Sequence, residues 1–378
     1  MQLYIGENIK RLRREKGITQ EILAERMHVS CAAVSKWERG ETLPDIGMII
    51  PLASYFGVST DEILGLDAAK NREKIDWYLS ESARMRVMGM GKERFSLVCQ
   101  AYTDFPNDWE IIEQYIEQLA YDPHYLPEQA GDPWGVIIHK EELLHLCQRV
   151  LDECPVDKVR YTALDTLVTV YSENDNREKA IETAMRFPEY WHTQGEQLEK
   201  CKEDGVEWMA QVRTNLYWLA CELFYKMRRV VQYEPSADSA VQLARYQTLL
   251  AFFDMIFAEG DYGFFHQEVS HLHFWMGDCC VRLKDSEKAF FHYEKGFYHA
   301  REYEILPRVI NHTSYFVKNV PFDMAKTNSN TEMNTVSLQM EWFMSRDIYN
   351  EVKDHPKMQE ILAKYRPFMG NKRDYTKL

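Results

Sequence analysis

The sequence lacks the long apolar segment that a membrane-spanning helix requires. No run of eighteen apolar residues occurs among its 378 residues. The opening stretch MQLYIGENIKRLRREKG has no apolar core of the kind found in a secretory signal. We therefore expect a cytoplasmic protein with no membrane partner.

The cysteine pattern gives no sign of disulfides or of a metal cluster. Eight cysteines are scattered through apolar stretches, and no two are spaced as Cys-x-x-Cys. In a cytoplasmic protein this pattern predicts reduced cysteines packed in the core.

Motifs for catalysis or nucleotide binding are also missing. The sequence contains no His-Glu-x-x-His, no Gly-x-Ser-x-Gly and no nucleotide-binding loop. The Gly-x-Gly-Lys that ends at Lys92 lacks the loop spacing and the following Ser or Thr, so it predicts a hinge between helices. We expect neither an enzyme nor a cofactor.

One group of metal-ligating residue types lies along a single expected helix. Within it, His271 and His273 are two residues apart and point to different faces of a helix. We therefore favour core packing over a metal site for the whole group, which comprises His266, His271, His273, Cys279 and Cys280.

Charge is divided unevenly along the chain. The formal net charge is −14, yet residues 1–40 carry eight Lys and Arg against five Asp and Glu. The remaining residues carry 37 basic and 54 acidic side chains. A small basic head on an acidic body suits a nucleic-acid-binding module whose body is repelled by phosphates.

The sequence of residues 1–66, called the head below, predicts five short helices. Thr19 and Ser30 are good N-caps for helices at 20–27 and 31–39, which a tight turn joins. An earlier helix at 6–16 places Ile5, Ile9 and Leu12 on one face and ends at Gly17, and two further helices cover 45–56 and 59–64.

The head resembles a known family over residues 5–66. The pattern KGITQEILAERM-x-VS-x-x-x-VSKWERGE-x-x-PD…LASYFGVSTDEILG is similar to the lambda-repressor-like, XRE-type helix–turn–helix family. The resemblance implies a five-helix DNA-binding domain whose third helix enters the major groove. His28 replaces the usual Gly, so we expect His28 to adopt a left-handed backbone conformation.

The resemblance also implies which residues meet DNA. Gln20 would bind a backbone phosphate, Arg39 would lie near another, and Arg13 and Glu38 would form an internal salt bridge. The full set of predicted DNA contacts is Thr19, Gln20, Ser30, Cys31, Ala32, Ala33, Ser35, Lys36 and Arg39.

The predicted reading face offers few groups that distinguish bases. Lys36 is its only charged residue among the base-facing positions, and guanine is its natural target. Cys31, Ala32 and Ala33 can at most contact thymine methyl groups, so DNA shape should carry part of the specificity. Cys31 stands at a helix N-terminus, which should lower its thiol pKa; a redox switch is the alternative to a passive side chain.

Helix follows helix from Lys92 onward. Tyr171 precedes Ala180 by nine residues, and Gly277 precedes Ala289 by twelve, with Tyr293 four residues later. These spacings resemble tetratricopeptide-like helical hairpins over 92–303; a non-repetitive bundle is the alternative. The expected helices are 93–102, 109–121, 139–153, 157–172, 177–186, 205–232, 238–258, 264–283 and 286–303.

The fold class is therefore predicted as all-α, with a five-helix DNA-binding domain followed by a tetratricopeptide-like array of helical hairpins. The domains are 1–66 for DNA binding, 67–91 as a helical linker, and 92–378 for regulation and dimerisation. Residues 121–135 and 311–335 are expected to be irregular, whereas VSLQMEW favours helix despite its strand-like alternation.

The predicted function is sequence-specific DNA binding in transcription regulation, with double-stranded DNA and a second copy of the chain as partners. Regulators that join these two modules include sensors of short peptides, so a peptide or protein partner is an alternative role for the body. A further alternative is an interaction scaffold with a vestigial head. The predicted ligand groove comprises Gln211, Asn215, Trp218 and Tyr225, although aromatic residues in such positions also form cores.

Overall fold

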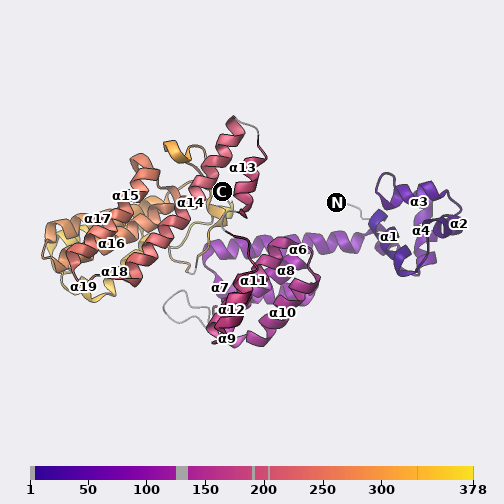
Figure 1. The fold of residues 1–378 in the computed structure, drawn as a ribbon, viewed down its shortest axis with the longest axis horizontal. Helices are drawn as coiled ribbons and strands as arrows, with labels where there is room; N and C mark the ends of the chain where they lie inside the picture. Colours follow the sequence, from indigo (N-terminus) through magenta and orange to yellow (C-terminus); the bar gives the residue numbers. More distant parts are fainter. Residues whose placement is uncertain (1–4, 125–134, 190–191, 203–204, 330, 378) are drawn as a thin grey trace. The chain divides into compact units, whose positions relative to one another are not determined.

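The computed structural model describes residues 5–124, 135–189, 192–202, 205–329 and 331–377. Nearly all of their regular structure is α-helical (Figure 1). The chain forms two compact units. The first contains residues up to Glu81 together with Gln100–Ile111, and the second contains Ser82–Cys99 together with residues from Ile112 onward.

Five short helices form the head, as predicted. Ile9, Leu23, Val34, Leu52 and Ile63 are fully buried at its centre. The helices are α1 (Ile5–Glu15), α2 (Gln20–Met27), α3 (Cys31–Glu38), α4 (Ile46–Phe56) and α5 (Thr60–Leu64).

The turn between α2 and α3 confirms the prediction for His28. Its φ and ψ of 55° and 40° lie in the left-handed region, where most L-residues are strained. Its backbone N–H bonds to carbonyls of the last turn of α2, which closes that helix before α3 begins.

The segment after the head is one long helix. α6 (Leu66–Met88) runs for 23 residues and ends at Gly89, whose φ is +72°. The predicted break at Gly89 is confirmed; a Cβ there would also meet the Thr331 backbone oxygen at 2.0 Å. The predicted division of the chain at 67–91 stays a prediction. The next helices are α7 (Gly91–Asp104) and α8 (Trp109–Ala120).

The second unit is built from helices that pack on their neighbours in sequence. α10 packs on α11, α11 on α12, α15 on α16, and α16 on α17, which confirms the predicted helical hairpins. α13 was not predicted. The helices are α9 (Gly135–Ile138), α10 (Lys140–Glu153), α11 (Asp157–Glu173), α12 (Arg177–Ala184), α13 (Gln194–Lys200), α14 (Val206–Tyr233), α15 (Ser239–Ile256), α16 (His266–Arg282) and α17 (Ser286–Glu304).

The contact between α16 and α17 explains the small residue at position 277. A Cβ on Gly277 would lie 2.5 Å from the Tyr293 ring, so only glycine lets the two helices approach this closely. Tyr293, Ala289 and Cys280 are all buried in the same core. The spacing of these residues in the sequence therefore reflects real packing between the two helices.

The C-terminal part contains three α-helices and a short β-ribbon. In α18 (Thr335–Met344), Val336, Met340 and Phe343 are buried at helical spacing, which confirms helix over strand. The ribbon overlaps the segment 311–335 that was predicted to be irregular, and it was not predicted. Its strands are β1 (Val309–Asn311) and β2 (Pro321–Asp323), and the remaining helices are α19 (Asp347–Asn350) and α20 (Pro356–Tyr365).

Six single-turn 3₁₀ helices complete the regular structure of the described chain: Ala258–Gly260, Gly263–Phe265, Tyr315–Val317, Met324–Lys326, Arg366–Phe368 and Tyr375–Lys377. Most of the loop expected at 121–135 lies outside the described residues. Among the helices that are described, none is long and apolar enough to cross a membrane.

Candidate nucleic-acid interface

Side-chain caps fix the starts of α2 and α3. Thr19 Oγ1 accepts a hydrogen bond from the Ile22 N–H at 3.4 Å, and Ser30 Oγ accepts one from the Ala33 N–H at 3.1 Å. Each such cap stabilises its helix by about 1 kcal/mol. The two caps hold the first turns of both helices in a defined orientation.

The two faces of α3 differ sharply in exposure. Val34 and Trp37 are buried in the core of the head, whereas Ala32, Lys36 and Arg39 are exposed. Of the other predicted contacts, Cys31 and Ala33 pack partly against the core. Ser35 is half-buried and Ser30 is exposed. The structure thus gathers the predicted reading residues on the outward side of one helix.

A buried carboxylate links α1, α2 and α3. Glu38 accepts hydrogen bonds from Arg13 Nε at 2.5 Å and Nη2 at 3.0 Å, and from Gln20 Nε2 at 2.8 Å. Burial would raise the pKa of Glu38, but the bonds from Arg13 and Gln20 hold that pKa below its ordinary value. The predicted salt bridge is confirmed, and the same carboxylate orients the Gln20 amide.

Arg39 already has a carboxylate partner. Its Nε and Nη2 donate to Glu41 at 2.6 and 3.1 Å, and its Nη1 donates to Ser35 Oγ. The bond from Arg39 lowers the pKa of Glu41. Glu41 was not among the predicted residues, although it follows Arg39 by two positions in the sequence. A phosphate must compete with this carboxylate for the Arg39 guanidinium.

Cys31 does not have the activated thiol that its helix position suggested. Its Sγ lies 3.6 Å from Glu21 Oε1. Desolvation and the Glu21 charge raise the pKa of Cys31, so the expected lowering was wrong. The thiolate is therefore disfavoured by the neighbouring Glu21 carboxylate, which supports the passive side chain over the redox switch.

The predicted ligand-groove residues hold α13 on α14. Asn215 Nδ2 donates to the Gly195 carbonyl at 3.1 Å and to Glu199 Oε2 at 2.7 Å, and Gln211 donates to Asn215 Oδ1 at 2.9 Å. The Asn215 amide is thus bonded internally, to α13 and to Gln211.

The two aromatic members of the predicted groove differ in exposure. Trp218 is exposed and packs edge-on against Tyr217, with ring centroids 5.2 Å apart. Tyr225 is half-buried, and the Arg228 guanidinium lies 5.2 Å from its ring centroid. The assignment of all four residues to a ligand groove stays a prediction.

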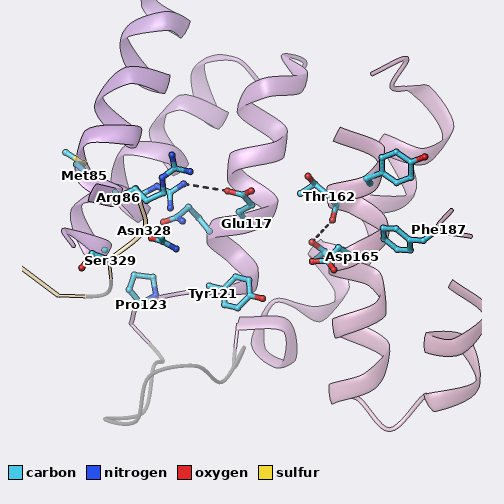
Figure 2. A pocket seen from close by; sticks show the side chains of 15 residues that line it. Met85, Arg86, Glu117, Tyr121, Pro123, Thr162, Asp165, Phe187, Asn328 and Ser329 are labelled. Carbon is cyan, nitrogen blue, oxygen red and sulfur yellow. Dashed lines mark hydrogen bonds and ion pairs between the residues drawn. The ribbon is translucent and has the colours of Figure 1, made fainter. Parts of the chain in front are cut away.

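A cavity of about 760 Å³ lies elsewhere in the second unit, and none of the four predicted groove residues lines it. Figure 2 shows side chains from α6, α8 and α11 around it, together with the segment at Asn328 and Ser329. Its complete lining is Met85, Arg86, Gly91, Arg94, Glu117, Gln118, Tyr121, Pro123, Tyr161, Thr162, Asp165, Thr166, Phe187, Asn328 and Ser329.

One part of the cavity wall carries buried charge. Arg94 Nε donates to Ser82 Oγ at 3.0 Å, and Arg94 Nη2 lies 3.7 Å from Glu117 Oε2. Burial lowers the pKa of Arg94 and raises that of Glu117. Arg86 Nε is buried and has no hydrogen-bond partner among the described residues. An unpaired buried donor is costly, so this wall favours an acceptor on a ligand.

Another part of the wall is formed by aromatic rings, hydroxyl groups and one carboxylate. The rings of Tyr161 and Phe187 stack with centroids 5.8 Å apart and planes 25° apart. Thr162, Thr166 and Asp165 line the cavity from α11 beside them. The cavity therefore offers an aromatic surface, hydroxyl groups, two guanidinium groups and the carboxylates of Glu117 and Asp165.

The histidines noted in the sequence form pairs with residues that sequence reasoning missed. His266 Nδ1 lies 2.9 Å from His299 Nδ1, and His273 Nδ1 lies 3.0 Å from His292 Nδ1. Within the ranges that the structure describes, no three His, Cys, Asp or Glu residues are grouped as a metal site requires. His292 and His299 are seven residues apart on α17, as His266 and His273 are on α16.

Comparison with known proteins finds the same kind of head. The family described as Helix-turn-helix matches residues 9–63. The HTH-type transcriptional activator BcrR of Enterococcus faecalis is 41% identical over 59 residues, which are 16% of this chain and 29% of BcrR. The HTH-type transcriptional regulator ImmR of Bacillus subtilis (strain 168) is 31% identical over 110 residues, 29% of this chain and 80% of ImmR.

Two solved structures align over most of the chain, but loosely. Bacillus thuringiensis PlcR, solved with the peptide PapR7 and DNA, is 18% identical with a TM-score of 0.28, over 78% of this chain and 93% of PlcR. ComR from S. thermophilus, solved with DNA and its signalling peptide ComS, is 14% identical with a TM-score of 0.25, over 80% of this chain and 94% of ComR. Scores this low leave the second unit to be interpreted from its own geometry.

Proposed function

Because this chain belongs to the helix–turn–helix family of transcriptional regulators, we propose that it binds operator DNA through α3 and controls transcription there. The observation that carries the proposal is the outward face of α3, where Lys36 and Arg39 are exposed beside capped helix starts. The proposed role is not catalytic, and its place of action is the cytoplasm.

Each predicted contact has a proposed part in DNA binding. Lys36 donates to a guanine edge, while Ser30 and Ser35 offer hydroxyl groups to neighbouring bases or phosphates. Cys31, Ala32 and Ala33 admit thymine methyl groups. Gln20 has a second amide hydrogen free of Glu38, and with Thr19 it clamps one phosphate, while Arg39 reaches another after leaving Glu41.

Two copies of the chain are needed for a selective site. The outward face of one α3 carries a single base-facing lysine and therefore distinguishes few bases. A second α3, placed on a DNA half-site about 34 Å away, should supply the rest of the sequence specificity. We therefore propose a homodimer on a two-fold symmetric operator.

Selection of bound DNA from a random duplex library tests this proposal with the full-length chain. We expect enrichment of a two-fold symmetric sequence, followed by a mobility shift with the enriched duplex and none with its scrambled form at the same salt. Failure to enrich any sequence would instead favour the interaction scaffold.

For the second unit, we propose binding of a short peptide in the cavity of Figure 2. The supporting observation is the unpartnered Nε of Arg86 beside buried Arg94, because two guanidinium groups suit a terminal carboxylate. Tyr161 and Phe187 suit an apolar side chain of the same peptide. Asn215 is a weaker candidate, since its amide is already bonded internally.

Thermal-shift screening of the full chain against short peptides tests this second proposal. We expect stabilisation by peptides with a free carboxyl terminus and little by the same peptides amidated. The Arg86→Leu variant should lose the stabilisation, while Arg282→Leu, at an exposed position on α16, serves as a control outside the cavity. Equal stabilisation of Arg86→Leu and the parent chain would overturn the proposed site.

A further inference from the structure

The outward face of α14 carries an apolar stripe at regular spacing. The residues of the stripe are separated by alternating steps of four and three positions. Among them, Leu219, Leu223 and Val230 are 38%, 50% and 60% exposed. The opposite face of α14 is buried in the core. We call the stripe the α14 seam; it comprises Val212, Leu216, Leu219, Leu223, Lys226, Val230 and Tyr233.

The spacing of the α14 seam is that of a coiled coil. Alternating steps of four and three residues keep side chains on the side that faces a partner helix, and single polar residues in such seams select register and orientation. In the seam this polar residue is Lys226. The pattern therefore indicates that this face binds another helix whose apolar residues follow the same spacing.

Four charged residues flank the α14 seam. Glu222 and Arg229 lie along one edge, and Arg213 and Glu234 lie along the other. Within each pair the two residues are too far apart along one helix to meet each other. In the part of the chain that the structure describes, none of the four side chains forms an ion pair, so their charges are available to a partner.

A second α14 in antiparallel orientation satisfies both edges at once. When Leu219 faces Val230 of the second copy, heptad geometry brings Glu222 against the second copy's Arg229. In the same register, Arg213 lies against the second copy's Glu234. Two-fold symmetry repeats each contact, which gives four ion pairs of opposite charge.

Other arrangements of two α14 helices are disfavoured by the same charges. Sliding the antiparallel pair by one heptad places Glu222 against Glu222 or Arg229 against Arg229. A parallel pair in register places the two Lys226 side chains in one core layer. The antiparallel register instead places Lys226 opposite Leu223, where its amine can extend to solvent.

We propose that the α14 seam is a homodimer interface, formed by antiparallel pairing with α14 of a second copy of this chain. This interface gives the location of the contact in the proposed homodimer. Only the role of the dimer rests on the proposed function; the pairing of the two helices does not require DNA. The pairing assigns the interface to one helix and specifies its register.

Sedimentation equilibrium of the full chain without DNA tests the interface. We expect the parent chain to be dimeric. Glu222→Arg should weaken dimerisation about tenfold or more, because it sets like charges together at two symmetric places. Adding Arg229→Glu should restore most of the affinity, since each new arginine then faces a glutamate of the second copy.

Two further variants make the result decisive. Leu219→Asp combined with Leu223→Asp should give a monomer with unchanged helical circular dichroism, whereas Glu287→Arg, an exposed charge reversal on α17, should leave the dimer intact. A monomeric parent chain, or a dimer that resists both Glu222→Arg and the double aspartate change, would overturn the interface. DNA selection with the parent chain tests the proposed function separately.

Discussion

At the scale of single residues, Glu38 connects the stability of the head with its proposed contact to DNA. The carboxylate is almost wholly buried and receives bonds from both Arg13 and Gln20. Because Gln20 is proposed to hold a phosphate, the same buried charge that ties the helices together also fixes the clamp.

Replacing Glu38 should therefore destabilise the head. Glu38→Ala leaves Arg13 without its buried partner, and we expect a loss of about 3 kcal/mol in the free energy of unfolding. Chemical denaturation followed by circular dichroism measures this loss. Glu15→Ala removes a partner of Arg11 at an exposed pair and should cost less than about 1 kcal/mol. Similar losses for the two variants would contradict the argument.

Lys36 should carry the direct base specificity. Lys36→Ala should weaken binding to the selected operator by about 1–3 kcal/mol, roughly ten- to a hundredfold, with a smaller change on scrambled DNA. Fluorescence anisotropy with both duplexes at one salt concentration measures the ratio. If the ratio of specific to scrambled affinity equals that of the parent chain, Lys36 does not read a base.

Glu41 should restrain DNA binding. Glu41→Gln removes a negative charge and releases Arg39 from its carboxylate partner, so affinity for any duplex should rise. The gain should be about two- to tenfold at low salt and should shrink as salt increases. A titration series in salt measures it, with Glu7→Gln on α1 as a control elsewhere in the head. An unchanged affinity at low salt would show that Arg39 does not reach a phosphate.

At the scale of helices, the ends could be predicted and the pairings mostly could not. Thr19, Ser30 and Gly57 marked helix boundaries because caps and left-handed termini are local properties of the chain. The β-ribbon at 309–323 was missed because three-residue strands show no periodicity. The pairing of His273 with His292 was missed because it joins two helices, and helical spacing describes only one.

The same limit applies to the two candidate sites. The family resemblance could propose a reading face on α3, because its residues follow one another along one helix. The cavity escaped prediction because Ser329 lines it together with Arg86, which lies far earlier in the sequence. Asn215 was assigned to a ligand from its residue type, whereas its partners Gly195 and Glu199 come from a helix that was not predicted.

The paired histidines between α16 and α17 should make stability depend on pH. Burial lowers the pKa of His266 to about 4 and that of His273 to about 3, and it also lowers those of His292 and His299. Asp261 opposes the shift at His266, whereas Lys295 and Lys288 favour neutral imidazoles. These histidines are therefore neutral in the folded chain at pH 7.

The sign of the pH effect follows from proton uptake. The unfolded chain binds protons below about pH 6.5, while the folded chain excludes them until the pH approaches 4, so acid favours unfolding. Stability should be complete above pH 6.5 and fall between 6.5 and 4, by up to about 1.4 kcal/mol per pH unit for each histidine. Denaturation at pH 7.5 and 5.5 checks this, and His266→Gln with His299→Gln should flatten the dependence. If the free energy of unfolding of that double variant changed with pH as steeply as that of the parent chain, these histidines would not be the cause of the pH dependence.

At the scale of the whole molecule, two compact units share one chain. The excess of basic side chains is confined to residues 1–40, since residues 41–66 carry four acidic and no basic side chains. The charge pattern therefore marks the part of the head that contains α1, α2 and α3, and not the boundary of the first unit, which extends to Glu81.

Two compact units should unfold in two calorimetric transitions rather than one. Glu38→Ala should lower the midpoint of one transition, and Gly277→Val, which sets a Cβ against the Tyr293 ring, should lower the midpoint of the other. Differential scanning calorimetry of the full chain measures both. A single transition that both variants shift equally would show that the units unfold together.

The segment that lines the cavity beside α6 has a consequence for synthesis. Ser329 donates its backbone N–H to the Arg86 carbonyl at 3.1 Å, so the wall beside Arg86 is finished only when residues near the end of the chain arrive. The head can fold as soon as its five helices leave the ribosome, since domains generally fold as units with the N-terminal one first. A nascent chain thus acquires the proposed DNA-binding surface well before the proposed ligand cavity, so a newly made chain should bind DNA before it can bind a peptide there.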